Sequence, residues 1–251
     1  MFTMLHPKKN KVWRMVEMII KTFKYAKKVD YVLIDTYSTK NFWYAFIISQ
    51  LCRILKLKYI PKLRGGNLPS RILRSKFFSN LIFKNAYINI APSYYLFEAF
   101  KNEGYNNLKY IPNTIEIQNY PDSPKEFKTP KILWARSFAK IYNPLMALKV
   151  FIKLKADFPE AKICMVGPKK DDSYAKTLQF AKKNNVEVIF TGKLSNQEWI
   201  ELSKDYNVFI NTTHFDNTPV SVIEAMALGL PVVSTNVGGI PFLLEQNVNA
   251  F

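Results

Sequence analysis

Short apolar segments alternate with helical ones along almost the whole of this 251-residue chain. Segments such as YVLIDTY at 31–37 and AKICMVG at 161–167 are typical of buried strands. Amphipathic stretches such as NPLMALKVFIKLKAD at 143–157 lie between them and are typical of helices. Because such a repeat connects parallel strands through helical crossovers, the pattern predicts an α/β protein with mostly parallel sheets covered on both faces.

A proline-rich segment divides the series. Residues 116–130, EIQNYPDSPKEFKTP, contain three prolines and show no apolar period. We therefore predict a first domain at 1–115, a linker at 116–130 and a second, doubly wound domain at 131–251. The chain opens on a basic helix and stops without a closing helix, so we expect both domains to be incomplete at their outer ends.

The opening helix, predicted over 9–28, carries an apolar stripe opposite a basic face. The stripe consists of Val12, Val16, Ile19, Ile20 and Phe23. The plainer interpretation is a surface helix packed on a sheet, and the alternative is a helix that lies on a membrane surface. No signal peptide is visible, and the most apolar run, at 42–52, is shorter than the roughly 20 residues that span a bilayer.

Charge is unevenly distributed. Residues 1–125 hold 21 Lys and Arg against 7 Asp and Glu, a net charge of +14, whereas residues 126–251 carry +3. The first half is thus expected to meet an anionic partner, such as a lipid headgroup or nucleic acid. The two cysteines, Cys52 and Cys164, have no disulfide or zinc spacing, which favours a reduced cytosolic compartment. Two histidines, His6 and His214, are too few for a His-based metal site or a Ser–His triad.

The stretch at 214–241 combines a helix start, a strand and a Gly-Gly loop. We predict that Asn217 or Thr218 caps the helix and that Pro219 occupies its first turn, which leaves free N–H groups for a phosphate. Carboxylates at Asp216 and Glu224 are suitable acceptors for sugar hydroxyls. Together these groups suit a nucleotide sugar, although spacing alone favours the plainer interpretation, a capped helix followed by a glycine turn.

Residues 215–241, FDNTPVSVIEAMALGLPVVSTNVGGIP, closely resemble the donor-site signature of retaining glycosyltransferases of family 4, also called group 1. The resemblance implies the GT-B fold, in which two Rossmann-like doubly wound domains face a cleft. It also implies that Glu224 binds the donor ribose, and that Asp216 and the backbone around Asn217, Thr218 and Pro219 contact the transferred sugar and the phosphates. The first acidic position is more usually Glu, which leaves the donor sugar open.

Weaker similarities extend this resemblance along the chain. The segment ILWARSFAKIYNP at 132–144 is similar to the loop that holds the donor pyrophosphate, which implies a catalytic role for Arg136. The usual Lys-Gly pair of the family falls near Tyr142 and Asn143, so Lys140 is a displaced candidate for the second cation. The backbone of Gly192, Lys193 and Leu194 is expected to face the nucleobase. The loop of Arg64, Gly65 and Gly66 is the candidate on the acceptor side, with Arg64 also catalytic.

The resemblance implies a retaining, metal-independent sugar transfer with no cofactor besides the nucleotide-sugar substrate. The adjacent acids at Asp171 and Asp172 are better interpreted as a helix N-cap than as a metal motif. The charge of the first half favours a glycan or lipid-linked acceptor, as in lipopolysaccharide or other cell-surface polysaccharide synthesis. We therefore expect a cytoplasmic protein that lies peripherally on the anionic inner face of the membrane.

Two alternatives remain open. A nucleotide-sugar epimerase shares this architecture but is expected to contain more acid–base groups, including histidines. A non-catalytic module could use the basic half to dock on a membrane or nucleic acid, but no RNA-recognition consensus, zinc finger or helix-turn-helix pattern is found, so no nucleic-acid partner is expected. An NAD-dependent oxidoreductase is disfavoured because no GxGxxG follows any predicted strand.

Overall fold

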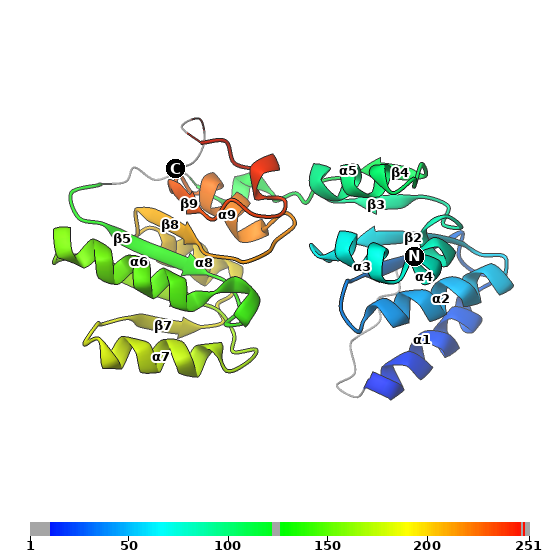
Figure 1. Ribbon diagram of the computed structural model, residues 1–251, viewed down its shortest axis with the longest axis horizontal. Coiled ribbons are helices and arrows are strands. Elements are labelled where there is room, and N and C mark those ends of the chain that lie inside the picture. The colour runs from blue at the N-terminus through cyan, green and yellow to red at the C-terminus, as the bar shows by residue number, and fades with distance from the viewer. Residues whose placement is uncertain (1–10, 122–125, 247, 249–251) are drawn as a thin grey trace. The chain divides into compact units, whose positions relative to one another are not determined.

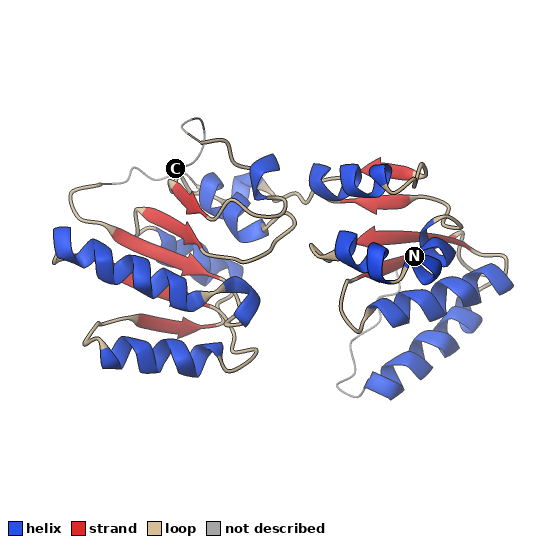
Figure 2. Ribbon diagram, in the orientation of Figure 1, coloured by secondary structure: helices blue, strands red, loops and turns tan. Residues whose placement is uncertain are grey.

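The computed structural model describes residues 11–121, 126–246 and 248, which divide into two compact units. The first unit ends at Pro112 and the second begins at Asn113 (Figure 1). Residues of the segment 116–130 that the structure describes therefore belong to the second unit. Helices flank the strands in each unit, as Figure 2 shows.

The first unit contains a four-stranded parallel sheet whose strands follow one another in chain order. They are β1 (Tyr31–Thr36), β2 (Lys58–Leu63), β3 (Asn89–Ala91) and β4 (Leu108–Tyr110). Its helices are α1 (Lys11–Tyr25), α2 (Phe42–Ile54), α3 (Leu68–Arg74), α4 (Lys76–Phe83) and α5 (Tyr94–Asn102). The sequence pattern does not predict α3 and α4, because both helices are short, at 7 and 8 residues, and an apolar run of that length is ambiguous between helix and strand.

Helix α1 packs only part of its predicted apolar stripe. Ile19, together with Met18, contacts a core cluster of the first unit. The side chains of Val12, Ile20 and Phe23 are exposed by 70%, 58% and 55%. Much of the apolar face is therefore open to its surroundings, and the membrane-surface interpretation of this helix stays a prediction.

The second unit contains a five-stranded parallel sheet in the order β7-β6-β5-β8-β9. The strands are β5 (Lys131–Ala135), β6 (Lys162–Val166), β7 (Ile189–Gly192), β8 (Val208–Asn211) and β9 (Val232–Ser234). The α-helices are α6 (Pro144–Asp157), α7 (Ser173–Lys183), α8 (Asn196–Ser203) and α9 (Val220–Ala227), and the 3-10 helices are η1 (Ile117–Asn119), η2 (Lys140–Tyr142) and η3 (Ile240–Phe242). The strand order reverses between β5 and β8, as in the doubly wound sheet that we predicted, and ligands of such sheets bind outside the carboxyl ends of the strands at this reversal.

Alternate residues of the central strand β5 enter two different cores. Ile132 and Trp134 pack in a cluster that includes residues of α6 and α7, whereas Leu133 packs in a cluster that includes residues of α8 and α9. Because successive side chains of a strand point to opposite faces, this division places helices on both faces of the sheet. The strands are thereby buried and the loops at their carboxyl ends are held in place.

No helix in residues 11–121, 126–246 and 248 has both the length and the apolar content that crossing a membrane requires. Cys52 and Cys164 are buried and free.

Candidate functional site

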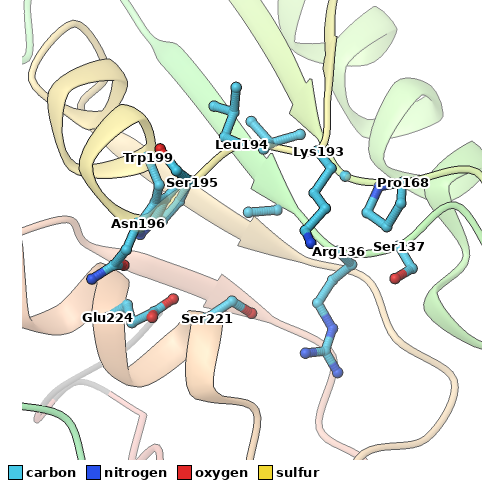
Figure 3. A pocket seen from close by; sticks show the side chains of 13 residues that line it. Arg136, Ser137, Pro168, Lys193, Leu194, Ser195, Asn196, Trp199, Ser221 and Glu224 are labelled. Atoms are coloured by element: carbon cyan, nitrogen blue, oxygen red, sulfur yellow. The ribbon is translucent and has the colours of Figure 1, made fainter. Parts of the chain in front are cut away.

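A cavity of about 280 Å³ lies at the carboxyl ends of β5, β6 and β7, beside α9. The cavity is lined by the last residues of β5 and β6, by residues that follow the three strands, by the start of α8 and by one face of α9, as Figure 3 shows. Its polar lining consists of Arg136, Ser137, Lys193, Ser195, Asn196, Ser221 and Glu224. The reversal of strand order thus gathers two cations and one carboxylate from three separate segments at one edge of the sheet.

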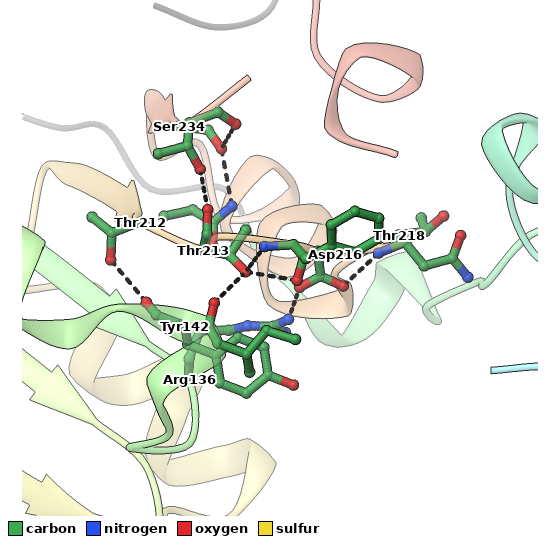
Figure 4. Close-up of polar contacts among 12 residues, drawn as sticks. Arg136, Tyr142, Thr212, Thr213, Asp216, Thr218 and Ser234 are labelled. Carbon is green, nitrogen blue, oxygen red and sulfur yellow. Dashed lines mark hydrogen bonds and ion pairs between the residues drawn. The ribbon is translucent and has the colours of Figure 1, made fainter. Parts of the chain in front are cut away.

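Arg136 and Asp216 form an ion pair in the second unit (Figure 4). Their side chains are only 15% and 14% exposed, so the pair is largely removed from water. The guanidinium carbon of Arg136 also lies 4.2 Å from the centre of the Tyr142 ring, a cation–π contact. Burial lowers the pKa of Arg136, but a guanidinium remains charged at physiological pH. Two predicted site residues 80 positions apart are therefore brought into direct contact.

The Arg136 guanidinium has unused hydrogen-bonding capacity. Its Nε atom is buried and has no hydrogen-bond partner among the residues that the structure describes. A buried donor without a partner costs free energy, and such groups in native proteins call for an explanation such as a ligand. The side chain lines the cavity, where an anion could accept from it.

Glycines hold the loop that carries Asp216. The N–H of Gly239 donates to the carbonyl oxygen of Asp216 at 3.0 Å, and the Asn217 N–H donates to the Asp216 carboxylate at 2.8 Å. A Cβ atom on Gly239 would overlap the Asn217 carbonyl, and Gly238 has a φ of +58° as well as contact with Asp216. The Gly-Gly loop after β9 therefore permits a close backbone approach that side chains would prevent.

The start of α9 differs from the prediction. Pro219 is the N-cap, with an extended ψ of 115°, and the first helical residue is Val220. Our assignment of Asn217 or Thr218 as the cap, with Pro219 inside the first turn, was therefore wrong. Asn217 is instead buried in the loop, and the Thr218 carbonyl accepts from the Asn113 side chain at 3.2 Å. None of these three residues is among those that line the cavity.

Glu224 faces the cavity from α9 and is partly buried (Figure 3). Burial raises the pKa of Glu224, and a hydrogen bond from the Tyr120 hydroxyl to its Oε1 atom, at 2.9 Å, opposes this effect. In water-poor surroundings a carboxylate with an open acceptor position binds hydroxyl groups well. Glu224 and Arg136 thus lie on opposite sides of the cavity, a carboxylate on one side and a cation on the other.

The two lysine candidates lie in different places. The Lys193 side chain extends into the cavity toward Arg136, as Figure 3 shows, and no carboxylate among the described residues pairs with it. Lys140 lines a separate hollow with His214, and its ammonium lies 3.6 Å from an Asp172 oxygen. Leu194 lines the cavity beside Lys193, whereas Gly192, at the end of β7, does not. The structure therefore brings Lys193, and not Lys140, together with Arg136.

The adjacent aspartates cap α7 in a way that differs slightly from the prediction. Asp172 stands at the N-cap position but makes no side-chain capping bond. Asp171 accepts from the Ser173 N–H at 2.8 Å and from the Lys140 N–H at 2.9 Å. A hydrogen bond with the Ser173 side chain, followed by these two backbone hydrogen bonds, lowers the pKa of Asp171. The capping role thus belongs to the earlier residue.

The predicted acceptor-side loop belongs to the first unit and is described within that unit. The Arg64 Nε atom donates to Asp35 at 2.9 Å, and the Arg64 N–H donates to the Thr36 carbonyl at 2.9 Å. A Cβ on Gly65 would lie 2.7 Å from the Ser38 backbone nitrogen, so the loop after β2 approaches the loop after β1 closely, and Gly66 continues it. The carboxyl ends of the first two strands therefore meet around a charged Asp35–Arg64 pair.

Several residues near the cavity were not predicted as site residues from sequence. Tyr142 lies against Arg136, and Tyr120, Asn196 and Ser221 line the cavity or contact Glu224. Asn196 and Ser221 lie in the first turns of α8 and α9, and a position at a helix start is a usable sequence signal. No sequence signal marks Tyr120, which lies in the segment predicted as a linker. No group of three or more His, Cys, Asp or Glu side chains within 11–121, 126–246 and 248 is arranged to hold a metal ion, and metal independence stays a prediction.

The sequence is similar to those of several known proteins. Residues 117–251 match the family described as "Glycosyl transferases group 1". The chain is 29% identical over 101 residues to the sulfoquinovosyl transferase SQD2 of Arabidopsis thaliana, which covers 40% of this chain and 19% of that protein. It is 23% identical over 147 residues to the phosphatidylinositol N-acetylglucosaminyltransferase gpi3 subunit of Schizosaccharomyces pombe, covering 56% of this chain and 31% of that one. The chain thus spans about a fifth and a third of these curated relatives.

The fold is also similar to that of solved structures. HepE of Anabaena, in a crystal structure with UDP and glucose, matches with a TM-score of 0.79 at 19% identity, over 98% of this chain and 70% of that one. At this identity the likeness concerns the fold alone, and it confirms the predicted fold class.

Proposed function

The chain belongs to the glycosyl transferases group 1 family, and we propose that it moves a sugar from a nucleotide-sugar donor to a glycan or lipid-linked acceptor. One observation carries this proposal. Arg136, Lys193 and Glu224 line a single cavity at the carboxyl ends of a doubly wound sheet, where cations suit a diphosphate and a carboxylate suits sugar hydroxyls.

In this proposal the donor lies along the cavity in a defined direction. Glu224 accepts from the ribose hydroxyls, and the backbone at Lys193 and Leu194 faces the nucleobase. The diphosphate lies against the Arg136 guanidinium and the Lys193 ammonium, whose charges stabilise the departing phosphate as its negative charge grows. Asp216, held beside Arg136, contacts the transferred sugar.

We propose a retaining transfer without a metal ion. The bond between the anomeric carbon and the diphosphate oxygen breaks while the acceptor oxygen bonds to the same carbon from the same face. The acceptor proton passes to an oxygen of the departing phosphate. The contribution of the chain is to hold both substrates in position and to stabilise the leaving group with fixed charges. The Arg64–Gly65–Gly66 loop is the proposed acceptor-side contact.

The proposed acceptor is a membrane-bound glycan precursor of a cell-surface polysaccharide or lipopolysaccharide. This proposal is supported by the +14 net charge of residues 1–125 and by the exposed apolar residues of α1. The name of one curated relative also includes phosphatidylinositol. We propose that the protein acts at the inner face of the cell membrane.

The proposed function predicts selective stabilisation by nucleoside diphosphates and their sugars. UDP, GDP, ADP and their glucose conjugates are compared by thermal unfolding; UDP is tried first because the similar HepE structure contains it. A ligand at one hundred times its Kd is expected to add about 2.7 kcal/mol to the free energy of unfolding. The Glu224→Gln variant should lose most of this effect, whereas Glu187→Gln, an exposed change in the same unit, should keep it.

Measurements of turnover distinguish a transferase from an epimerase. A transferase releases nucleoside diphosphate faster when a crude lipid-linked glycan fraction is added as acceptor. An epimerase converts the donor to its epimer with no acceptor present. Absence of binding by every donor in the panel would contradict both enzymatic functions and favour a docking module.

The membrane proposal predicts that the protein floats with phosphatidylcholine vesicles only when they contain phosphatidylglycerol. Basic residues near such a surface contribute about 1 kcal/mol each, so high salt should reduce the binding. Changing both Ile20 and Phe23 to Glu should abolish flotation. The matched control is Ile54→Glu, which alters a residue of the same unit that is 76% exposed. Equal flotation with neutral and anionic vesicles, or equal loss in both variants, would contradict the proposal.

A further inference from the structure

Tyr120 connects the segment that follows the first unit to the wall of the cavity. The 3-10 helix η1 ends just before it, and the Tyr120 N–H donates to the Ile117 carbonyl at 2.9 Å. This turn leaves Ile117 60% exposed and Tyr120 only 6% exposed. The Tyr120 ring packs in the core cluster that also contains residues of α8 and α9. A short turn in a proline-rich segment thus places the Tyr120 side chain in the core beside the cavity.

The Tyr120 hydroxyl lies between two residues of the cavity wall. Its oxygen is 2.9 Å from Oε1 of Glu224 and 3.1 Å from Oδ1 of Asn196. A phenol has one proton, and an ionised carboxylate is a stronger acceptor than an amide. Burial, followed by the hydrogen bond to Glu224, raises the pKa of Tyr120, so the hydroxyl keeps its proton. The proton therefore goes to Glu224.

This hydrogen bond determines which carboxylate oxygen of Glu224 is free to accept a hydrogen bond from a ligand. With Oε1 engaged by Tyr120, Oε2 remains for a ligand in the cavity, and rotation of the carboxylate is restricted. The charged groups that face Glu224 across the cavity are Arg136 at the end of β5 and Lys193 after β7. Asn196 and Ser221 are its uncharged neighbours on the cavity wall.

We infer that Tyr120 is a positioning residue, which orients Glu224 so that its free oxygen accepts from the donor ribose. This inference rests on the proposed function, since it gives the ribose-binding group a partner within the chain. Tyr120 does not touch the reacting atoms. It acts only through Glu224, so its removal should alter recognition of the ribose hydroxyls and leave binding of the diphosphate to Arg136 unchanged.

The test uses the Tyr120→Phe variant of the whole chain, which removes the hydroxyl and keeps the packed ring. Affinities are measured by calorimetry for UDP, or for GDP or ADP if the wild type prefers one of these, and for the 2′-deoxy and 3′-deoxy forms of the same nucleotide. The wild type should bind the ribonucleotide about tenfold more tightly than at least one deoxy form. Tyr120→Phe should bind the ribonucleotide about tenfold more weakly and that deoxy form with little change.

The pH dependence supplies a second readout. Burial raises the pKa of Glu224 and the Tyr120 hydrogen bond lowers it. Without the hydroxyl only the raising effect of burial remains, so the pKa of Glu224 rises further. Because the ionised carboxylate is the acceptor, Tyr120→Phe should lose nucleotide affinity at a higher pH than the wild type as the pH falls.

Tyr206→Phe is the matched control, because Tyr206 is a second buried tyrosine of the same core cluster and does not line the cavity. This variant should keep both the affinity and its pH profile. If Tyr120→Phe distinguishes ribose from deoxyribose as the wild type does, the inference is overturned while the proposed function stands. The inference is also overturned if the wild type binds the ribonucleotide and its deoxy forms with equal affinity. A wild type that binds no nucleoside diphosphate contradicts the proposed function itself.

Discussion

Replacing Arg136 with glutamine is expected to lower kcat/KM for sugar transfer by about 10²–10³-fold. The loss should fall mainly on kcat, because the guanidinium charge matters most as the diphosphate departs. Arg136 is suited to this role by its place in the cavity and by its buried Nε atom without a partner among the described residues. Steady-state rates of nucleoside diphosphate release, measured over a range of donor concentrations, separate the effects on kcat and KM.

The ion pair with Asp216 complicates the interpretation of that variant. Removing one partner from a pair this buried leaves the other charge uncompensated, at a cost of about 3–5 kcal/mol in the free energy of unfolding. The double variant Arg136→Gln with Asp216→Asn removes both charges and should regain most of the stability without regaining activity. If activity returns together with stability, the role of Arg136 is structural and the leaving-group assignment is wrong.

The second large effect is expected at Lys193. Lys193→Met keeps most of the length of the side chain and removes the charge, and it should weaken binding of UDP by roughly 10–30-fold. Lys140→Met should change the affinity by less than about threefold, because Lys140 is paired with Asp172 and lines another hollow. The two variants form a matched pair, since each removes one lysine charge from the second unit.

Uridine provides the internal reference for this comparison. It lacks the diphosphate, so Lys193→Met should leave its affinity unchanged. Equal weakening of uridine and UDP would instead assign Lys193 to the nucleobase, and a larger loss in Lys140→Met would restore the original candidate. Calorimetry or competition with a fluorescent nucleotide measures both ligands under the same conditions.

The alternation of strands and helices was sufficient to predict the fold class. The signals involved are local: β5 and β6 consist of short apolar runs, and α6 repeats apolar residues at helical spacing. Local signals failed where elements are short. Helices α3 and α4 fall in a stretch to which we assigned nothing, and the start of α9 was placed too early because Pro219 is as compatible with the cap as with the first turn.

The residues of the candidate site also fall into two groups: those that a local sequence motif marks, and those that only the fold brings to the site. Asp216 and Glu224 are recognisable because they lie in one continuous motif, and Arg136 because it follows a strand in a familiar segment. Tyr120 was missed because nothing near it in the chain indicates that its hydroxyl reaches a helix that begins 100 residues later. Lys140 was chosen over the Lys193 side chain because proximity to Arg136 in sequence was the available guide.

By itself, the order of residues determined the α/β class, the doubly wound second domain and the motif that carries the acidic pair, because each depends on patterns within a few residues or one motif. Only the tertiary structure decided which lysine shares a cavity with Arg136, that Asp216 pairs with that arginine, and that Tyr120 supports Glu224. The physical reason is that strand order and packing bring these groups together across 57 to 104 positions of chain, and the charge and hydrogen bonding of a buried group are determined by its neighbours in space.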